Sequence, residues 1–488
     1  MKKDCLNLII RNNVDVDGIT EAIINEFRKY YKKVSGIVIN CNSEKNQKDN
    51  LFEYIPWEIV GSHDSEYLFE PDTPIDGDVL DAMKEYKSMA MHIMMRTLHY
   101  DVYDRKYLEN IYFKHLKYWN AVLKNKNINM AIFMVTPHHV GEYILYSLCQ
   151  IYNINTIIMY PQLSYHGSGW FIGKSIETIG ANIGDRYKKY KDTDYVDTTL
   201  SDFLQGNVNN TLQNKVVGYG NRKKIASNAK KNIYALIKMK RLMLLSVAYV
   251  KNYFNKNRRS RLRNEIKYIV RARKYERKMD HLKEYNKHAK QPVDGEKYIY
   301  FPLQMTPEAS TMPLAGEFNN QLLSIELLAS AAKEYNLKVY VKEHWVQYNR
   351  DTDFYKRISE ISNVRLISLE YNSLDLLEKS VMVATQTGNV LYEALVKGKP
   401  AISIGRGCTY KDAPNIFVVQ NRDDISNSIK QVLDDNFKIT QEDIEMYLKA
   451  IDDCIIFSYL DSIDESYKEY DKEKTARQII EFAEDYCD

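Results

Sequence analysis

The sequence predicts an α/β protein with two parallel sheets, and three observations support this fold class. Strand-like apolar runs alternate with helical patterns in residues 6–160 and again in residues 298–419. This alternation is typical of parallel strands joined by helices. Polar clusters directly follow several of the strand-like runs, at the edge where parallel sheets bind ligands. A length of 488 residues also exceeds what one hydrophobic core usually holds, so two domains are expected.

The first α/β part extends to about residue 160. Its predicted strands are residues 6–10, 34–40, 130–135 and 155–160. Its predicted helices are residues 19–31, 78–98, 105–124 and 140–152. Residues 41–75 contain Pro56, Pro71 and Pro74 and are expected to form a loop.

The turn-forming sequence QPVDG at residues 291–295 predicts the start of the second α/β part. Its predicted strands are residues 298–301, 338–341, 364–369, 381–384, 401–404 and 416–419. Its predicted helices are residues 319–335, 373–379, 389–397 and 424–434. The acidic tail from Thr440 onward is predicted to be helical.

The net charge of +3 hides a strongly basic stretch. Residues 221–290 contain 23 Lys and Arg against 4 Asp and Glu, which leaves −16 for the rest of the chain. Such a stretch fits an anionic membrane surface, nucleic-acid phosphates or a solvated helical hairpin. Residues 233–254 mix apolar and basic side chains, as interfacial helices do.

The six cysteines show neither a CxxC pair nor the spacing of a metal site, which predicts reduced thiols and a cytoplasmic protein. The first residues do not resemble a signal peptide. No run approaches the roughly 18 to 20 apolar residues that span a bilayer, so we expect a soluble or peripheral protein.

The strongest local signal is TQTGNVLYEALVKGKP, residues 385–400. Thr385, Thr387 and Gly388 lie between a predicted strand and a predicted helix, where amides and hydroxyls favour phosphate. Glu393 lies about one helical turn further on and could bind a ribose hydroxyl. An ordinary strand–helix turn capped by threonine is the alternative.

Two further clusters are predicted at the same sheet edge. Lys342, Glu343 and His344 follow one strand, and this histidine could contact phosphate or transfer a proton. The segment TPEAS (306–310) adds Glu308 and two hydroxyl residues. A structural histidine and a solvated loop are the alternatives.

The first half offers two candidate groups. Asp17 and Gly18 follow the first predicted strand, where a simple turn before a helix is the alternative. His138, His139 and Glu142 follow the strand at 130–135 and could bind acceptor hydroxyls or move a proton. A metal would need a further ligand, and none is expected.

Three segments in this order and spacing resemble the capsule polysaccharide biosynthesis family. They are FPLQMTPEAST (301–311), VYVKEH (339–344) and TGNVLYEALVKGKPAISIGRGCTY (387–410). The family includes bacterial transferases of the Kdo and sialic-acid type. The resemblance implies a GT-B fold, in which two Rossmann-like domains face a cleft, and a CMP-activated sugar as donor.

The resemblance also implies roles for single residues. His344 stands where the family's His-Pro motif places a histidine near the CMP phosphate, although Trp345 replaces the proline here. Thr387 and Gly388 match the small-residue phosphate loop, and Glu393 matches the Glu-Ala-Leu helix facing the nucleotide. Asp17 with Gly18 resembles the acidic-Gly motif of bacterial sialyltransferases.

Together these observations predict four regions. They are an N-terminal acceptor domain (1–200), a basic helical insertion (201–290), a C-terminal nucleotide-sugar domain (291–436) and C-terminal helices (437–488). A lipid-linked acceptor favours contact of residues 221–290 with the inner face of a bacterial membrane, and no nucleic acid is expected.

The predicted activity is a metal-independent glycosyltransferase without cofactor that moves a 2-keto acid (Kdo or a nonulosonate) from CMP to a surface-polysaccharide or lipid-linked glycan. The catalytic candidates are Asp17, His138 and His344. The donor candidates are Gln304, Glu308, Lys342, His344, Thr387, Gly388, Asn389, Glu393 and Arg406. The acceptor candidates are His139 and Glu142. The alternatives are a CDP- or UDP-linked donor and a noncatalytic assembly or membrane-binding factor.

Overall fold

The computed structural model describes most of both α/β parts of the chain. The described residues are 3–12, 18–40, 49–57, 60, 74–97, 105–163, 168–193, 243–244, 246–250, 266, 281–306, 308–344, 347, 350–434, 437–457 and 471–484. The statements below refer to these residues.

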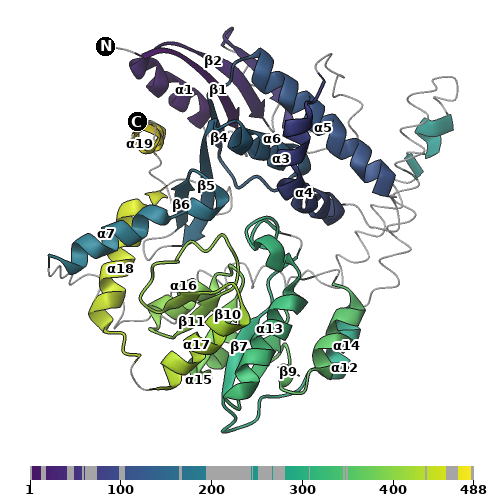
Figure 1. Cartoon of the computed structure of the whole chain (residues 1–488), viewed down its shortest axis with the longest axis vertical. Coiled ribbons are helices and arrows are strands. Elements are labelled where there is room, and N and C mark those ends of the chain that lie inside the picture. Colours follow the sequence, from purple (N-terminus) through teal and green to yellow (C-terminus); the bar gives the residue numbers. More distant parts are fainter. Residues whose placement is uncertain are drawn as a thin grey trace.

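The first sheet has seven strands in the order β13-β6-β5-β4-β1-β2-β3 (Figure 1). The strands are β1 (Lys3–Arg11), β2 (Tyr31–Asn40), β3 (Phe52–Pro56), β4 (Met130–Phe133), β5 (Asn155–Leu163), β6 (Ser168–Gly173) and β13 (Ile456–Phe457). Strands β1 to β5 pair in parallel, whereas β6 and β13 pair antiparallel.

Helices cover both faces of the first sheet because β1 alternates its apolar side chains between them. Leu8 and Ile10 pack with α1 (Ile19–Tyr30) and α19 (Lys472–Glu484), whereas Ile9 packs on the opposite side. The helices on that side are α4 (Lys84–Thr97), α5 (Arg105–Asn125) and α6 (Val140–Ile151). Each face is therefore fully apolar, as expected of a doubly covered sheet.

The second sheet has six strands, all paired in parallel, in the order β12-β11-β10-β7-β8-β9. The strands are β7 (Tyr298–Pro302), β8 (Lys338–Lys342), β9 (Val364–Leu366), β10 (Met382–Thr385), β11 (Ala401–Ser403) and β12 (Ile416–Val418). The helices are α12 (His281–His288), α13 (Gln321–Glu334), α14 (Thr352–Glu360), α15 (Ser373–Lys379), α16 (Val390–Val396), α17 (Arg422–Leu433) and α18 (Gln441–Cys454).

Both sheets have the same strand order, which confirms the predicted fold class of two Rossmann-like α/β domains. Counted within each domain, the first five strands lie in the order 3-2-1-4-5. The order reverses between β1 and β4 in the first domain, and between β7 and β10 in the second. Such reversal points are where open α/β sheets bind ligands beyond their strand ends.

The two domains contact each other through aromatic and polar side chains. Helix α7 (Ala181–Lys191) lies beside α18, and Tyr187 meets Tyr447 edge to face at 5.3 Å between ring centroids. Phe171 of the first sheet meets Tyr410 of the second domain at 6.2 Å. The chain then returns to the first domain, where β13 joins the first sheet and α19 packs on α1 (Figure 1).

Several elements differ from the sequence prediction. Residues 52–56, expected in a loop, form the edge strand β3, because they pair with β2. The single helix predicted at 78–98 is two helices, α3 (Gly77–Ala82) and α4. Strand β6 and helices α7 and α14 were not predicted, and β13 is a strand within the tail that was predicted to be helical.

The boundaries at 200, 290 and 436 stay predictions, since most of residues 194–280 lie outside the described part. Among the described helices, none is both long enough and apolar enough to cross a membrane.

Candidate functional site

The end of β7 and the end of β10 are joined by one buried side chain, Gln304. Its Oε1 accepts hydrogen bonds from the amide of Thr387 (3.1 Å) and the hydroxyl of Thr385 (3.2 Å), and its Nε2 donates to Thr387 Oγ1 (3.4 Å). Thr387 Oγ1 donates in turn to the carbonyl of Ser310 (2.6 Å). The loop at residues 385–388 is therefore held in place across the reversal point of the sheet.

The phosphate-binding roles of Thr387 and Gly388 stay predictions, and both residues also have contacts within the protein. The amide and the hydroxyl of Thr387 already have partners within the protein, so direct phosphate binding would break those bonds. A Cβ at Gly388 would lie 2.9 Å from Thr385 Oγ1 and 3.3 Å from Gln304 Cδ. The glycine is thus required by the packing of the loop itself.

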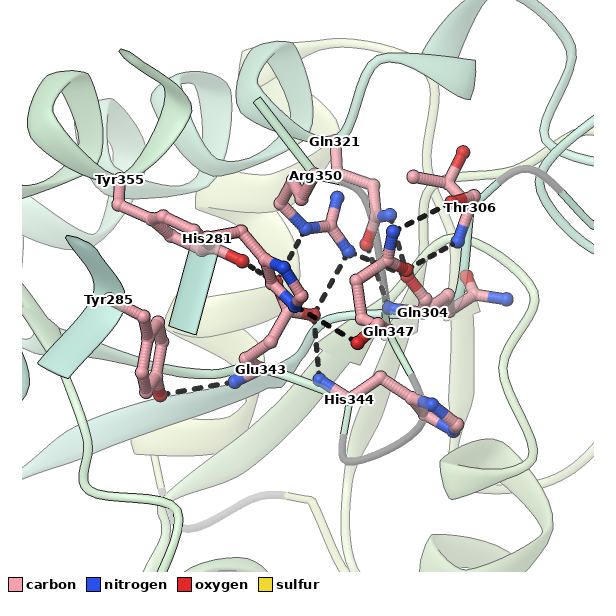
Figure 2. A network of polar contacts seen from close by, with 10 residues as sticks. All are labelled: His281, Tyr285, Gln304, Thr306, Gln321, Glu343, His344, Gln347, Arg350 and Tyr355. Carbon is pink, nitrogen blue, oxygen red and sulfur yellow. Dashed lines mark hydrogen bonds and ion pairs between the residues drawn. The ribbon is translucent and has the colours of Figure 1, made fainter. Parts of the chain in front are cut away.

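Two further glutamines hold the backbone that follows β7 (Figure 2). Gln321 accepts from the amide of Gln304 (2.8 Å) and donates to its carbonyl (2.9 Å). Gln347 accepts from the amide of Thr306 (2.9 Å) and donates to its carbonyl (2.8 Å). Each glutamine side chain bonds both the N–H and the C=O of one loop residue, as the backbone of a neighbouring strand would. The loop is therefore held in place although no further strand pairs with it.

A buried ion pair lies beneath His344. Arg350 Nη2 donates to Glu343 Oε1 (3.0 Å) and to the carbonyl of Gln304 (2.9 Å), and Tyr355 donates to the other oxygen of Glu343. The backbone amide of His344 donates to Glu343 Oε1 (2.7 Å). Figure 2 shows the imidazole pointing away from this network. One buried carboxylate thus holds the backbone of His344 and, through Arg350, the backbone of Gln304.

Sequence reasoning missed Arg350, Tyr355, Gln321 and Gln347. Arg350 follows β8 in a polar stretch without periodicity, and α14, which carries Tyr355, was not predicted. The polarity of Gln321 was no signal either, because the helix that it begins also contains Ser324, Glu326 and Lys333.

Two donor candidates have shifted acidities. Burial lowers the pKa of Lys342 to about 8, and its Nζ donates to the carbonyl of Tyr371 (2.6 Å) and to Ser373 Oγ (2.8 Å). Burial raises the pKa of Glu393 to about 7, and Lys397 one turn away offsets only part of this. Both groups are poised to change charge near neutral pH.

The remaining donor candidates lie on the surface. Glu308 is exposed and accepts from Ser310 Oγ (3.1 Å) within its own turn. Asn389 is exposed at the start of α16. Arg406 forms an ion pair with Glu317 (2.8 Å), which a phosphate would have to displace.

The first domain has a second buried ion pair, at the reversal point between β1 and β4. Arg11 at the end of β1 pairs with Glu142 in the first turn of α6, and both side chains are nearly inaccessible. Trp57 Nε1 donates to Glu142 Oε1 (3.0 Å). The amides of His138 and His139 donate to Glu142 Oε2 (3.4 Å each).

The carboxylate of Glu142 stays ionised. Burial alone would raise its pKa, but Arg11, then His139 and His138, and the Trp57 hydrogen bond lower it to about 2. Direct contact of Glu142 with an acceptor would require these partners to move. His138 Nδ1 lies 2.6 Å from the carbonyl of Thr136, which can only accept, so in the neutral ring Nε2 carries the lone pair.

His138, His139 and Glu142 also place metal-ligand atoms within 4.8 Å of one another. The guanidinium of Arg11 contacts the same carboxylate, and its charge opposes a cation there. The absence of a metal stays a prediction. Asp17 lies outside the described residues, so its catalytic role also stays a prediction.

The two domains thus hold their histidines in the same way. In each, a buried glutamate pairs with an arginine, accepts the histidine's backbone amide and accepts a third bond from an aromatic side chain. Each arrangement lies at the carboxyl ends of parallel strands beside the reversal point.

Residues 212–432 match the sequence model of a family described as capsule polysaccharide biosynthesis protein. The resemblance to this family is confirmed over that segment. The matched segment includes the second sheet, the loop at 385–388, and the residues that bond to Glu343 beneath His344. No curated protein matches the chain.

Several solved structures align with the chain at low identity and low TM-score. The beta Kdo 2,7 transferase of KpsC from Thermosulfurimonas dismutans is 11% identical, with 84% of this chain and 97% of that chain covered and a TM-score of 0.31. The beta Kdo 2,4 transferase of the same KpsC is 20% identical, with 36% of this chain and 54% of that chain covered and a TM-score of 0.24. UDP-GlcNAc 2-epimerase from Neisseria meningitidis is 11% identical, with 92% of this chain and 99% of that chain covered and a TM-score of 0.24.

Proposed function

We propose that the protein is a glycosyltransferase that moves a sugar, a 2-keto acid such as Kdo or a nonulosonate, from CMP to a surface-polysaccharide or lipid-linked glycan. One observation carries the proposal. The capsule-family segment contains a preformed histidine-bearing edge at the reversal point of its sheet, where nucleotides bind in such folds.

The donor would bind to the second domain. Transfer breaks the bond between the anomeric carbon and a phosphate oxygen, and CMP leaves with the electron pair. Negative charge grows on the phosphate, so positioned donors and cations there stabilise the transition state. His344 would supply one such donor. Lys342 uses two of its three N–H groups inside the protein and would supply the third.

The acceptor would bind to the first domain, and its hydroxyl would lose a proton as the new bond forms. His138 is the proposed base because the Thr136 carbonyl holds the proton on Nδ1 and leaves the lone pair on Nε2. Asp17 remains the alternative base, and we propose that no metal takes part.

We further propose that residues 221–290 contact an anionic membrane surface. Residues 243–244 and 246–250 are helical, and Met243 (71% exposed), Leu244 (61%) and Val250 (71%) present apolar side chains to solvent. Their basic sequence neighbours suit a surface of anionic lipid.

The first test is a thermal-shift series with CMP, CDP, UDP and ADP without added metal. A ligand at about 100 times its Kd stabilises by about 2.7 kcal/mol, which is a shift of a few degrees. We expect CMP to shift the melting temperature, and His344→Ala to remove the shift. His288→Ala is the matched control, because His288 pairs with Glu284 on α12 and lies outside the proposed site.

Other outcomes would contradict the proposal at different points. A shift with UDP or CDP alone would contradict the CMP donor and leave a transferase of this fold. No shift with any nucleotide would favour a noncatalytic assembly factor. A lost CMP shift in His288→Ala would show that the effect is not specific to His344.

A further inference from the structure

Trp57 differs from the other aromatic residue that binds a buried glutamate in this protein. Tyr355, which donates to Glu343 in the second domain, is fully buried and belongs to the core. Trp57, which donates to Glu142 in the first domain, is only half-buried. Tyr355 is therefore enclosed by the core, whereas Trp57 packs against the core, bonds to Glu142 and remains partly exposed.

The indole forms a continuous group with two imidazoles. Trp57 and His139 meet edge to face, with ring centroids 4.9 Å apart and an interplanar angle of 89°. His139 and His138 follow at 4.4 Å and 45°. All three side chains are half-buried, so the group offers aromatic and polar atoms together.

The group is held rigidly. The indole N–H is fixed by Glu142, the carboxylate is fixed by Arg11, and His138 is fixed by the Thr136 carbonyl. Burying an ion pair costs desolvation energy and often adds little to stability. An ion pair that instead orders an accessible aromatic group at a sheet edge indicates a preorganised binding surface.

We propose that Trp57, His139 and His138 form a subsite for a neutral pyranose ring of the acceptor glycan. The apolar C–H face of a pyranose suits an aromatic ring, which gives contact area at a small cost in side-chain entropy. Imidazole nitrogens bond sugar hydroxyls as donors or acceptors, and at His138 this role falls to Nε2 because Nδ1 faces the Thr136 carbonyl. The inference rests on the proposed function, since it names the substrate class of the acceptor side.

The subsite belongs to the acceptor rather than the donor because of its place in the fold. It lies at the ends of β3 and β4 in the first domain, whereas the loop at 385–388 and His344 lie in the second. The lone pair of His138 Nε2 is on the same group of rings, so a sugar bound there would bring a hydroxyl to the proposed base.

The test titrates methyl glucopyranoside, methyl galactopyranoside and methyl mannopyranoside up to ~20 mM by saturation-transfer NMR, a range that includes millimolar Kd values. We expect Trp57→Ala to weaken binding about tenfold and Trp57→Phe to retain most of it, because the ring is kept. Tyr30→Ala is the control, since Tyr30 is an exposed aromatic residue on α1.

The CMP-induced thermal shift is measured on the same variants and should not change. Equal pyranoside binding by the wild type and Trp57→Ala would overturn the inference, as would no binding by the wild type. If Trp57→Ala does not fold, Trp57→Phe becomes the decisive variant. Tenfold weaker pyranoside binding by Trp57→Phe would then overturn the proposal that the sugar packs on an aromatic ring face at this position. Failure of the proposed donor would appear separately, as a missing CMP shift in a wild type that still binds pyranosides.

Discussion

At the scale of single residues, two glutamates show how surroundings set acidity. Glu142 is buried, but Arg11 contacts its carboxylate and its pKa falls to about 2. Glu393 is half-buried, and its nearest cation, Lys397, is engaged with Glu378 (2.6 Å). Burial therefore dominates and raises its pKa to about 7. One carboxylate is held charged and the other changes charge near neutral pH.

Glu393→Gln should have a pH-dependent effect on stability. A pKa raised from 4.5 to about 7 favours the protonated form in the folded state. That stabilisation is present below pH 4.5 and is lost as pH rises through 7. Glutamine imitates the protonated form, so the variant should match the wild type at pH 4.5 and exceed it at pH 8. The upper limit is about 3 kcal/mol, reduced by solvent screening.

Urea unfolding at the two pH values measures this difference. Glu360→Gln is the control, since Glu360 is exposed on α14. An equal stability difference between Glu393→Gln and the wild type at both pH values would show that Glu393 does not titrate in this range.

At the scale of elements, the loop at 385–388, where we propose that the donor binds, depends on side chains that join strand ends. The loop after β10 begins a helix of only seven residues, which gives little stability by itself. Gln304 from the end of β7 supplies the bonds that the loop lacks, and Gln321 and Gln347 hold Gln304 and its neighbours. The edge is therefore preformed before any ligand binds.

Gln304→Leu tests this coupling. It keeps the approximate volume but leaves the buried Thr387 amide unpaired, which costs about 1–3 kcal/mol. We expect a lower urea midpoint and a smaller CMP-induced thermal shift. Gln420→Leu on the exposed surface is the control. A stable variant with the full CMP shift would show that the loop does not need Gln304.

At the scale of the whole molecule, charge is segregated along the chain. Residues 221–290 carry +19 and the remainder carries −16. The exposed apolar side chains of residues 243–250 lie within this basic stretch. Attraction to anionic lipid by basic residues weakens with ionic strength, whereas apolar insertion does not.

The protein should therefore co-sediment with vesicles of phosphatidylglycerol and phosphatidylcholine but not with phosphatidylcholine alone. Leu244→Glu should weaken binding, because it removes an apolar side chain and adds a repelled charge. Leu80→Glu is the control, as Leu80 is 38% exposed in the first domain. Equal binding to both kinds of vesicle, or no binding at low salt, would contradict the membrane proposal.

The sequence predicts the α/β class, most strands, and the placement of His138, His139 and His344 just beyond strand ends. These features follow from local patterns, because alternation and turn chemistry act over a few residues. The edge strand β3 was not predicted, because its pairing with β2 is a tertiary contact.

Which residues meet at the candidate site depends on long-range contacts in the fold. Arg11 and Glu142 are 131 residues apart, and Gln304 and Thr387 are 83 apart. Each pair meets because the strand order reverses between β1 and β4, and between β7 and β10. Arg11, Trp57, Gln321, Gln347 and Arg350 carry no local signal of their own for these partners. Their roles come from sheet order and burial, which periodicity along the chain does not encode.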